Sequence, residues 1–248
     1  MIIDSHAHIE EVPGSPWFDP PETMVRLMDE AKIDKAIVMT YRDAPSSVID
    51  VIEYVKNSVA KFPDRLIGYA RINPDSRQAE DLLINAITKY KMKGLKLHPL
   101  GYRNFPDSKG TVNLIKLAVR FNAPILFHCG DEDYTLPLQI ERVAFLVPDA
   151  KIILGHMGGY FHVNDSLKVA LRNKNIILET SGMPYPSMIK KAVELIGPKR
   201  VLFASDGPGC DPKIELEKIK ISGLTKDEEK LVMGENIQKI LDEVKHEL

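Results

Sequence analysis

Short apolar runs recur at a steady interval along the whole chain, and this rhythm restricts the folds open to it. Eight runs of four or five residues begin 25 to 34 residues apart. They are rich in Ile, Leu and Val and show no polar alternation, which is typical of parallel strands buried on both faces. The runs occupy residues 2–5, 36–40, 66–70, 94–97, 124–127, 151–155, 176–180 and 201–204.

The segments between these runs carry apolar residues three and four positions apart, which predicts amphipathic helices. Helices are expected at residues 22–31, 46–62, 78–91, 111–121, 135–146, 165–172 and 187–196. Strand followed by helix, repeated along the chain, predicts an α/β fold of the (β/α)8 TIM barrel type. The alternative, an open doubly wound sheet, is disfavoured because no G-x-G-x-x-G turn follows the first run.

The length of 248 residues fits one such barrel. Because no linker-like or low-complexity segment interrupts the pattern, residues 1–248 are predicted to form a single domain. Residues 8–21 are expected to form a long first loop that contains Pro13, Pro16, Trp17, Pro20 and Pro21. Residues 209–225 are expected to form another loop with a short helical piece, and residues 226–245 a final helix or two.

The charge balance argues against two classes of partner. A formal net charge of -2 gives no reason to expect nucleic acid or an anionic membrane. A small-molecule substrate is expected instead, and a homo-oligomer stays open.

The N-terminus lacks a signal-peptide pattern and no run reaches the ~18 apolar residues of a spanning helix, so a cytoplasmic location is expected. Cys129 and Cys210 lack C-x-x-C spacing and are expected to be small buried hydrophobic residues.

Polar residues gather where the predicted strands end. Because the strands of a barrel end on one face, these side chains are expected to converge on a single cavity. Five of the seven histidines are among them, and residues two apart on a strand point to the same side. The set comprises His6, His8, Arg71, Lys96, His98, His128, His156, Glu179 and Asp206. Imidazoles with one carboxylate suit Zn²⁺ with an open position for water, and also Fe²⁺, Mn²⁺ or Co²⁺.

Several stretches of the sequence together resemble a known family. These are IIDSHAH (2–8), GLKLHP (94–99), PILFHCG (124–130), ILGHMGG (153–159), ILETSG (177–182), VLFASDGP (201–208) and GENIQKIL (234–241). Over nearly its full length the chain resembles the amidohydrolase superfamily, in the amidohydrolase-related branch that contains aminocarboxymuconate semialdehyde decarboxylase-like enzymes. The resemblance implies one divalent metal ion, with Zn²⁺ expected first, held by His6, His8, His128 and Asp206. His156 would then contact the metal-bound water and substrate, or bind a less expected second ion.

The resemblance implies a metal-dependent hydrolase acting on an amide, a lactone or another ester of small size. A divalent ion lowers the pKa of bound water to about 7 and so makes hydroxide available at neutral pH. In this hypothesis Asp206 carries the proton of that water to the leaving group. His156 polarises the carbonyl or stabilises the oxyanion.

Two alternatives remain open at this point. The first is a metal-dependent decarboxylase of a small aromatic or unsaturated acid that uses the same ligands. The second is a barrel without catalytic activity that has a binding role.

Other strand-end residues are candidates for substrate binding. Lys96 lies where binuclear members of the superfamily carry a carboxylated, metal-bridging lysine, but the following His98 resembles mononuclear relatives more closely. Lys96 and His98 are therefore expected to face the substrate, with a bridging or a structural role for Lys96 as the alternatives. Arg71 can pair with a substrate carboxylate through two hydrogen bonds. Glu179 is expected to anchor polar contacts of the barrel, and Asp4 to orient a ligand or the strand end.

Overall fold

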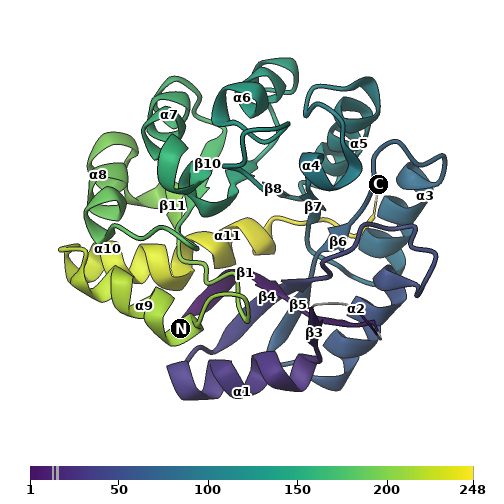
Figure 1. Cartoon of the computed structure of the whole chain (residues 1–248), viewed down its shortest axis with the longest axis horizontal. Helices are drawn as coiled ribbons and strands as arrows, with labels where there is room; N and C mark the ends of the chain where they lie inside the picture. The colour runs from purple at the N-terminus through teal and green to yellow at the C-terminus, as the bar shows by residue number, and fades with distance from the viewer. Residues whose placement is uncertain (13, 15–16, 248) are drawn as a thin grey trace.

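A ring of parallel strands occupies the centre of the molecule, with helices arranged around it (Figure 1). The computed structural model describes residues 1–12, 14 and 17–247. The strands of the ring are β1 (Ile3–His8), β4 (Lys35–Met39), β5 (Leu66–Gly68) with β6 (Ala70–Arg71), β7 (Leu95–Leu97), β8 (Ile125–Phe127), β9 (Ile152–Leu154), β10 (Ile176–Glu179) and β11 (Val201–Leu202). Each lies at or beside a predicted apolar run, and the predicted (β/α)8 barrel is confirmed.

Two short interruptions in the ring are bridged by backbone hydrogen bonds. Between β5 and β6, the amide of Tyr69 donates to Val38 of the neighbouring strand at 3.0 Å. Between β11 and β1, the amide of Asp206 donates to the carbonyl of His6 and that of His8 to Gly207, both at 2.7 Å. The second closure brings the residues after β11 directly beside the histidines of β1.

Two apolar layers hold the barrel together. One cluster takes residues from successive strands, among them Ile37, Leu126 and Ile153, and fills the inside of the barrel. The second and larger cluster packs the outer faces of the strands against the helices. These helices are α1 (Pro21–Ala31), α2 (Val51–Lys61), α3 (Ala79–Ile84) with its π-helical extension η1 (Asn85–Lys89), α5 (Lys109–Arg120), α6 (Pro137–Leu146), α7 (Gly159–Arg172), α8 (Pro186–Ile196) and α9 (Pro212–Ile221).

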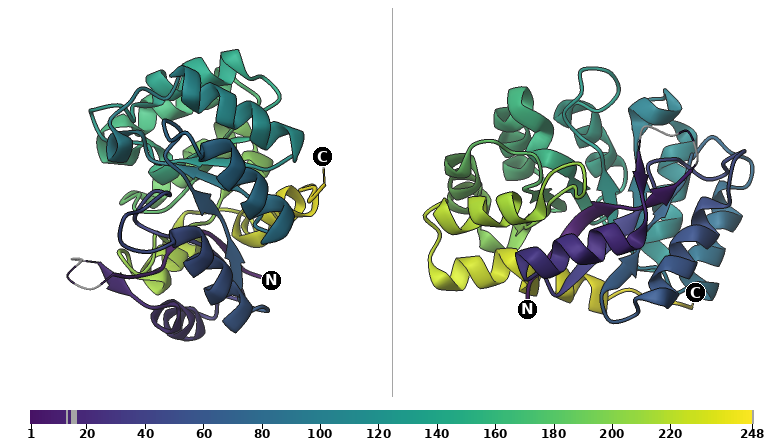
Figure 2. Two further views of the ribbon diagram at one scale, coloured as in Figure 1. Left: turned by 90° about the vertical axis from the view of Figure 1, so that its right-hand side faces the viewer. Right: turned by 60° about the horizontal axis from the view of Figure 1, so that its bottom comes forward.

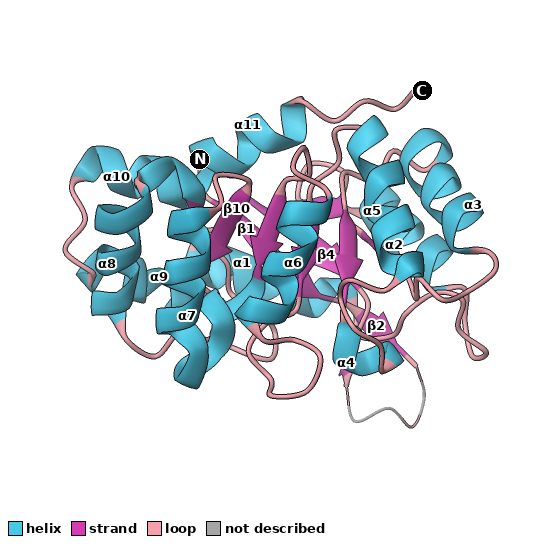
Figure 3. Ribbon diagram, turned by 90° about the horizontal axis from the view of Figure 1, so that it is seen from above, coloured by secondary structure: helices cyan, strands magenta, loops and turns pink. Residues whose placement is uncertain are grey.

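The two ends of the barrel are covered differently. At one end α11 (Asn236–Asp242), which follows α10 (Lys226–Lys230) and η4 (Leu231–Glu235), packs Ile237, Ile240 and Leu241 against the inner cluster. At the opposite end lie the short helix α4 (Pro99–Tyr102) and a hairpin of β2 (Glu10–Glu11) and β3 (Phe18–Asp19) (Figure 3). The left view of Figure 2 shows the purple hairpin and the yellow C-terminal helix on opposite sides of the barrel. The strands point their carboxyl ends toward the hairpin, so the site is expected there.

Several predicted boundaries were wrong for local reasons. Residues 46–50 do not join α2, because the Asp50 side chain accepts hydrogen bonds from the amides of Ile52 and Glu53 and so begins the helix. Residues 209–225 contain α9, a regular helix of ten residues that begins at a similar Asp211 cap. The predicted first loop contains the β2–β3 hairpin, and its Pro13 and Pro16 lie outside the described residues.

Two further expectations concern membranes and cysteines. In the described part of the chain, no helix combines the length and apolar character needed to cross a membrane. Cys129 is buried as expected, whereas Cys210 is only half-buried.

Candidate metal centre

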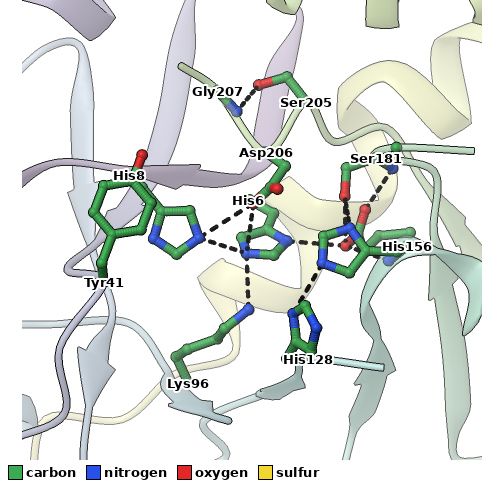
Figure 4. A network of polar contacts seen from close by, with 12 residues as sticks. His6, His8, Tyr41, Lys96, His128, His156, Ser181, Ser205, Asp206 and Gly207 are labelled. Atoms are coloured by element: carbon green, nitrogen blue, oxygen red, sulfur yellow. Dashed lines mark hydrogen bonds and ion pairs between the residues drawn. The ribbon is translucent and has the colours of Figure 1, made fainter. Parts of the chain in front are cut away.

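Three side-chain atoms that can bind a metal meet at the carboxyl end of β1. His6 Nε2 and His8 Nε2 lie 3.1 Å apart, and Asp206 Oδ1 lies 3.4 Å from the first and 3.2 Å from the second. Figure 4 shows the three groups pointing at one another. Ligand atoms at about 2.1 Å from one ion are separated by about 3.0 to 3.4 Å in octahedral or tetrahedral geometry. The donor set therefore fits a divalent metal ion, as the sequence predicted for these three residues.

The backbone explains why these atoms meet. Strand β1 has an irregular register between Asp4 and Ala7, where three steps along β1 match two along β4, and such a bulge re-aims a side chain near a site. The sequence predicted that both histidines follow the strand. In the structure they lie within it, since β1 extends to His8. Asp206 has a φ of 60°, in the left-handed region, which turns the chain sharply after β11 and directs its carboxylate back toward β1.

A buried aspartate ties the two segments together. Asp4 Oδ1 accepts hydrogen bonds from the amides of Ser205 at 2.8 Å and His6 at 3.2 Å. Asp4 Oδ2 accepts a hydrogen bond from the Ser205 hydroxyl. Burial raises the pKa of Asp4 to about 7 although these bonds oppose the rise. Asp4 thus links the backbone of His6 to that of Ser205, the residue before Asp206.

His6 is oriented by a carboxylate. Its Nδ1 lies 3.0 Å from Glu179 Oε1, and both side chains are fully buried. Burial alone would raise the pKa of Glu179, but the hydrogen bond from His6 and the other donors outweigh it and keep that pKa below its usual range. Because ionised Glu179 can only accept, Nδ1 carries the hydrogen and Nε2 presents its lone pair to the site. Lys96 Nζ donates to this same Nε2 at 2.8 Å, which is consistent with that assignment.

Glu179 also fixes His156. Its Oε1 accepts hydrogen bonds from the His156 amide at 2.8 Å and the Ser181 hydroxyl at 2.9 Å, and its Oε2 accepts one from the Ser181 amide. His156 Nδ1 lies 2.8 Å from Ser181 Oγ. One buried carboxylate therefore supports both a candidate ligand and the candidate catalytic histidine.

His128 does not face His6, His8 or Asp206 directly; it contacts His156 instead. Its Nδ1 faces His156 Nε2 at 3.1 Å, and its Nε2 faces Asp131 Oδ2 at 2.8 Å. Burial lowers the pKa of His128 well below its usual range, which keeps the ring neutral and able to bind a metal. The structure thus brings His6, His8 and Asp206 into direct contact, and a ligand role for His128 stays a prediction.

A cavity of about 420 Å³ opens beside these groups and is lined by His8, Asp206, Lys96, Arg71 and His98, among others. Arg71 is buried, with its Nε donating to Asp43 Oδ1 at 2.8 Å. His98 Nδ1 accepts a hydrogen bond from the Gly101 amide at 2.8 Å, so its Nε2 carries the hydrogen. Burial, followed by the charge of Arg71, lowers the pKa of Lys96 to about 7.

Some residues of this site were not predicted from the sequence. Glu179 was noted only as a structural anchor, and Ser181 was not singled out. Tyr41 follows the second predicted strand and stacks on the His8 ring with centroids 4.4 Å apart and an interplanar angle of 13°. Its position just after a barrel strand was the one available signal, because sequence spacing alone does not show which rings stack. The side chain of Asp131 is about half exposed and faces His128.

Comparisons with known proteins agree on the type of barrel. A family model described as amidohydrolase matches residues 3–242. The chain is similar in structure to 5-carboxyvanillate decarboxylase from Sphingomonas paucimobilis, with 16% identity, 97% of this chain and 98% of that one covered, and a TM-score of 0.78. No protein with a curated description matches the sequence.

Two further solved structures differ in the chemistry that they represent. A dihydroxybenzoic acid decarboxylase from Polaromonas sp. JS666, with bound manganese and 2-nitroresorcinol, has 18% identity, coverage of 97% and 96%, and a TM-score of 0.75. A probable 2-pyrone-4,6-dicarboxylic acid hydrolase from Acinetobacter baumannii has 16% identity, coverage of 97% and 99%, and a TM-score of 0.71. At these identities the similarity establishes the barrel fold only.

Proposed function

Because the chain belongs to the amidohydrolase family, whose members are metal-dependent enzymes, we propose that it is a metal-dependent decarboxylase of a small aromatic or unsaturated acid. The observation that carries the proposal is the cavity lined by His8, Asp206, Arg71 and Lys96, at the point where His8 and Asp206 meet the buried His6. Similarity to several decarboxylases supports this chemistry over the hydrolysis that the sequence put first.

The cavity suits a planar acid. The Arg71 guanidinium has its Nε bound to Asp43, and its terminal Nη atoms can pair with a substrate carboxylate. His98 Nε2 offers one hydrogen to a substrate oxygen. Tyr41 and Trp17 line the same cavity, and the half-exposed Trp17 ring offers a flat apolar surface to a conjugated substrate.

The reaction requires the carboxylate carbon to leave as CO₂ while its bonding electron pair stays on the substrate, where a proton then replaces it. A bound divalent ion supplies positive charge that orients a substrate oxygen and stabilises this negative charge. Asp206 is the group that we propose to carry the proton. The His6 and His8 contacts hold its pKa well below the usual range despite burial, so Asp206 is ionised and has room for a proton. A substrate hydroxyl made more acidic by a bound divalent ion would supply that proton, and Asp206 would return it to the carbon. His156, held by Ser181 and Glu179, is placed to hydrogen-bond the developing charge.

We propose Mn²⁺ or Zn²⁺ as the divalent ion. Two imidazole nitrogens and a carboxylate oxygen suit both metals. The manganese bound to one similar decarboxylase supports testing Mn²⁺ beside the Zn²⁺ expected from the sequence. The partner is proposed to be a small molecule.

The test is a substrate panel offered to protein loaded with Mn²⁺ or Zn²⁺, with chelator-treated protein as the control. Dihydroxybenzoates and carboxylated phenols are expected to release CO₂ in proportion to the metal bound, with about one ion per chain by elemental analysis. Absence of metal after supplementation would contradict the metal centre itself. Metal-loaded protein that releases no CO₂ from any acid would contradict decarboxylation alone.

Hydrolysis is the second candidate, and similarity to a probable 2-pyrone-4,6-dicarboxylic acid hydrolase supports keeping it. The same panel therefore includes lactones of unsaturated acids. Ring opening without release of CO₂ would favour this second candidate.

A further inference from the structure

The two histidines of β1 differ in what holds their rings. His6 has a hydrogen-bond partner for the nitrogen that points away from the site, namely Glu179 at 3.0 Å. His8 Nδ1 is buried and has no hydrogen-bond partner among the described residues. Histidines that bind metals usually donate this second nitrogen to a carboxylate or carbonyl, which fixes the ring. His8 therefore needs another source of orientation.

An aromatic ring supplies it. Tyr41 lies almost parallel to His8, with centroids 4.4 Å apart and planes 13° apart. Figure 4 shows the two rings face to face, with His8 between Tyr41 and the other donors. Tyr41 also stacks on Trp17, with ring centroids 5.4 Å apart and planes 27° apart. The Tyr41 hydroxyl donates to Asp19 Oδ2 at 3.0 Å and so anchors the ring to β3.

We infer that Tyr41 is a positioning residue for the metal centre, which acts by holding the His8 imidazole flat so that its Nε2 faces His6 and Asp206. Stacking restricts the tilt of the His8 ring, which no hydrogen bond on Nδ1 restricts. The inference rests on the proposed metal centre and adds to it a group that never touches the ion.

The test compares three variants of the 248-residue chain by titration with Mn²⁺ and Co²⁺ in a calorimeter. Tyr41→Leu removes the ring and is expected to raise the dissociation constant about tenfold or more, the usual effect of losing a group that orients a ligand. Tyr41→Phe keeps the ring and loses only the bond to Asp19, so its dissociation constant is expected to stay within about threefold of the parent protein. The parent value is the reference for all variants.

Tyr54 offers a matched control. Its hydroxyl donates to Glu11 Oε2 at 3.0 Å and anchors the other strand of the same hairpin without touching His8. Tyr54→Leu is expected to leave metal affinity unchanged. The visible absorption of bound Co²⁺ reports ligand geometry, and only Tyr41→Leu is expected to change it.

Each outcome separates one idea from another. Parent protein that binds no metal would contradict the proposed function rather than the role of Tyr41. Unchanged affinity and spectrum in Tyr41→Leu would overturn the positioning role, and so would equal losses in Tyr41→Phe and Tyr41→Leu. Should Tyr41→Leu fail to fold by circular dichroism, Tyr41→Met takes its place with the same expectations, since a flexible thioether tolerates irregular packing.

Discussion

The inner and outer sides of the metal centre are built by different interactions. On the inner side, Glu179 holds His6 and His156 through buried hydrogen bonds between strands of the barrel. On the outer side, Tyr41 holds His8 by stacking, while Tyr41 itself stacks on Trp17 and donates a hydrogen bond to Asp19 of β3. The hydrogen bonds to the Glu179 carboxylate fix the direction of a ring nitrogen, whereas stacking on Tyr41 restricts the plane of the ring. The two sides should therefore respond differently to substitution, pH and loss of packing.

Asp206 joins the two sides, since its Oδ1 faces both His6 and His8, and its replacement is expected to have the largest effect. Asp206→Asn keeps the shape and one coordinating oxygen, but an amide cannot carry a proton. Turnover of an identified substrate should fall by about 10² to 10⁴, with weakened but detectable metal binding. Metal content and turnover are measured on the same samples.

His128→Ala is the comparison for Asp206→Asn. It should chiefly lower metal content if His128 is a ligand, and added metal should then partly restore turnover. Near-normal turnover in metal-loaded Asp206→Asn would mean that the proton travels through another group, with His156 as the next candidate.

Glu179→Gln tests the inner side. An amide nitrogen in place of one oxygen would face donors, either His6 Nδ1 or the Ser181 amide, so at least one buried bond must break. Metal affinity is expected to fall about 10- to 100-fold, at least as much as for Tyr41→Leu, as measured by calorimetric titration.

A control for Glu179→Gln lies on the outer helices. Glu141 accepts hydrogen bonds from Arg172 and Asn173 but lies on α6, away from the metal centre. Glu141→Gln should lower the unfolding temperature without changing metal affinity. Equal metal affinity in Glu179→Gln and the parent protein would refute the distinction between the two sides.

Asp4 provides a pH test on the same strand as both histidines. Its pKa is raised from 3.8 to about 7 by burial, so between these values the native state binds a proton that the unfolded state releases. Stability from this group is therefore present at low pH and is lost as pH rises toward 7. Relative to Asp4→Asn, which cannot ionise, the parent protein should lose on the order of 4 kcal/mol of unfolding free energy between about pH 4 and about pH 8. Urea unfolding of metal-free protein across this range measures it, and a constant difference would contradict the assignment.

The barrel could be predicted from the sequence because its signal is local. Apolar runs of strand length and helical spacing are properties of neighbouring residues, and the strand ends then follow from the topology. The meeting of His6, His8 and Asp206 was predictable for the same reason. The β1 bulge, the α9 helix and the β2–β3 hairpin were missed, because capping and pairing with distant residues decide them.

The support of the site was less predictable than its ligands. Glu179 lies 173 positions from His6 in sequence, and a buried glutamate at a strand end is equally compatible with a purely structural role. Tyr41 carries no motif, since a stack depends on ring planes rather than on residue order. Residue types thus indicated what could bind a metal, whereas the groups that hold those residues in place required the structure.

Replacing Trp17 is expected to have the smallest effect on metal affinity and a larger effect on substrate binding. It stacks on Tyr41 and lines the cavity, and about half of its surface is exposed. Since it does not stack on His8 itself, Trp17→Ala should change metal affinity by less than about threefold, within the weaker range of aromatic pairs. The KM of an identified substrate should rise by a larger factor than the metal affinity changes, because the substrate loses the aromatic surface of Trp17. Tyr41→Leu should show the opposite order, with metal affinity changing more than KM at saturating metal. If Trp17→Ala instead weakened metal binding as much as Tyr41→Leu, the stack would act as one unit, and the orientation of His8 would depend on the whole hairpin rather than on the ring beside it.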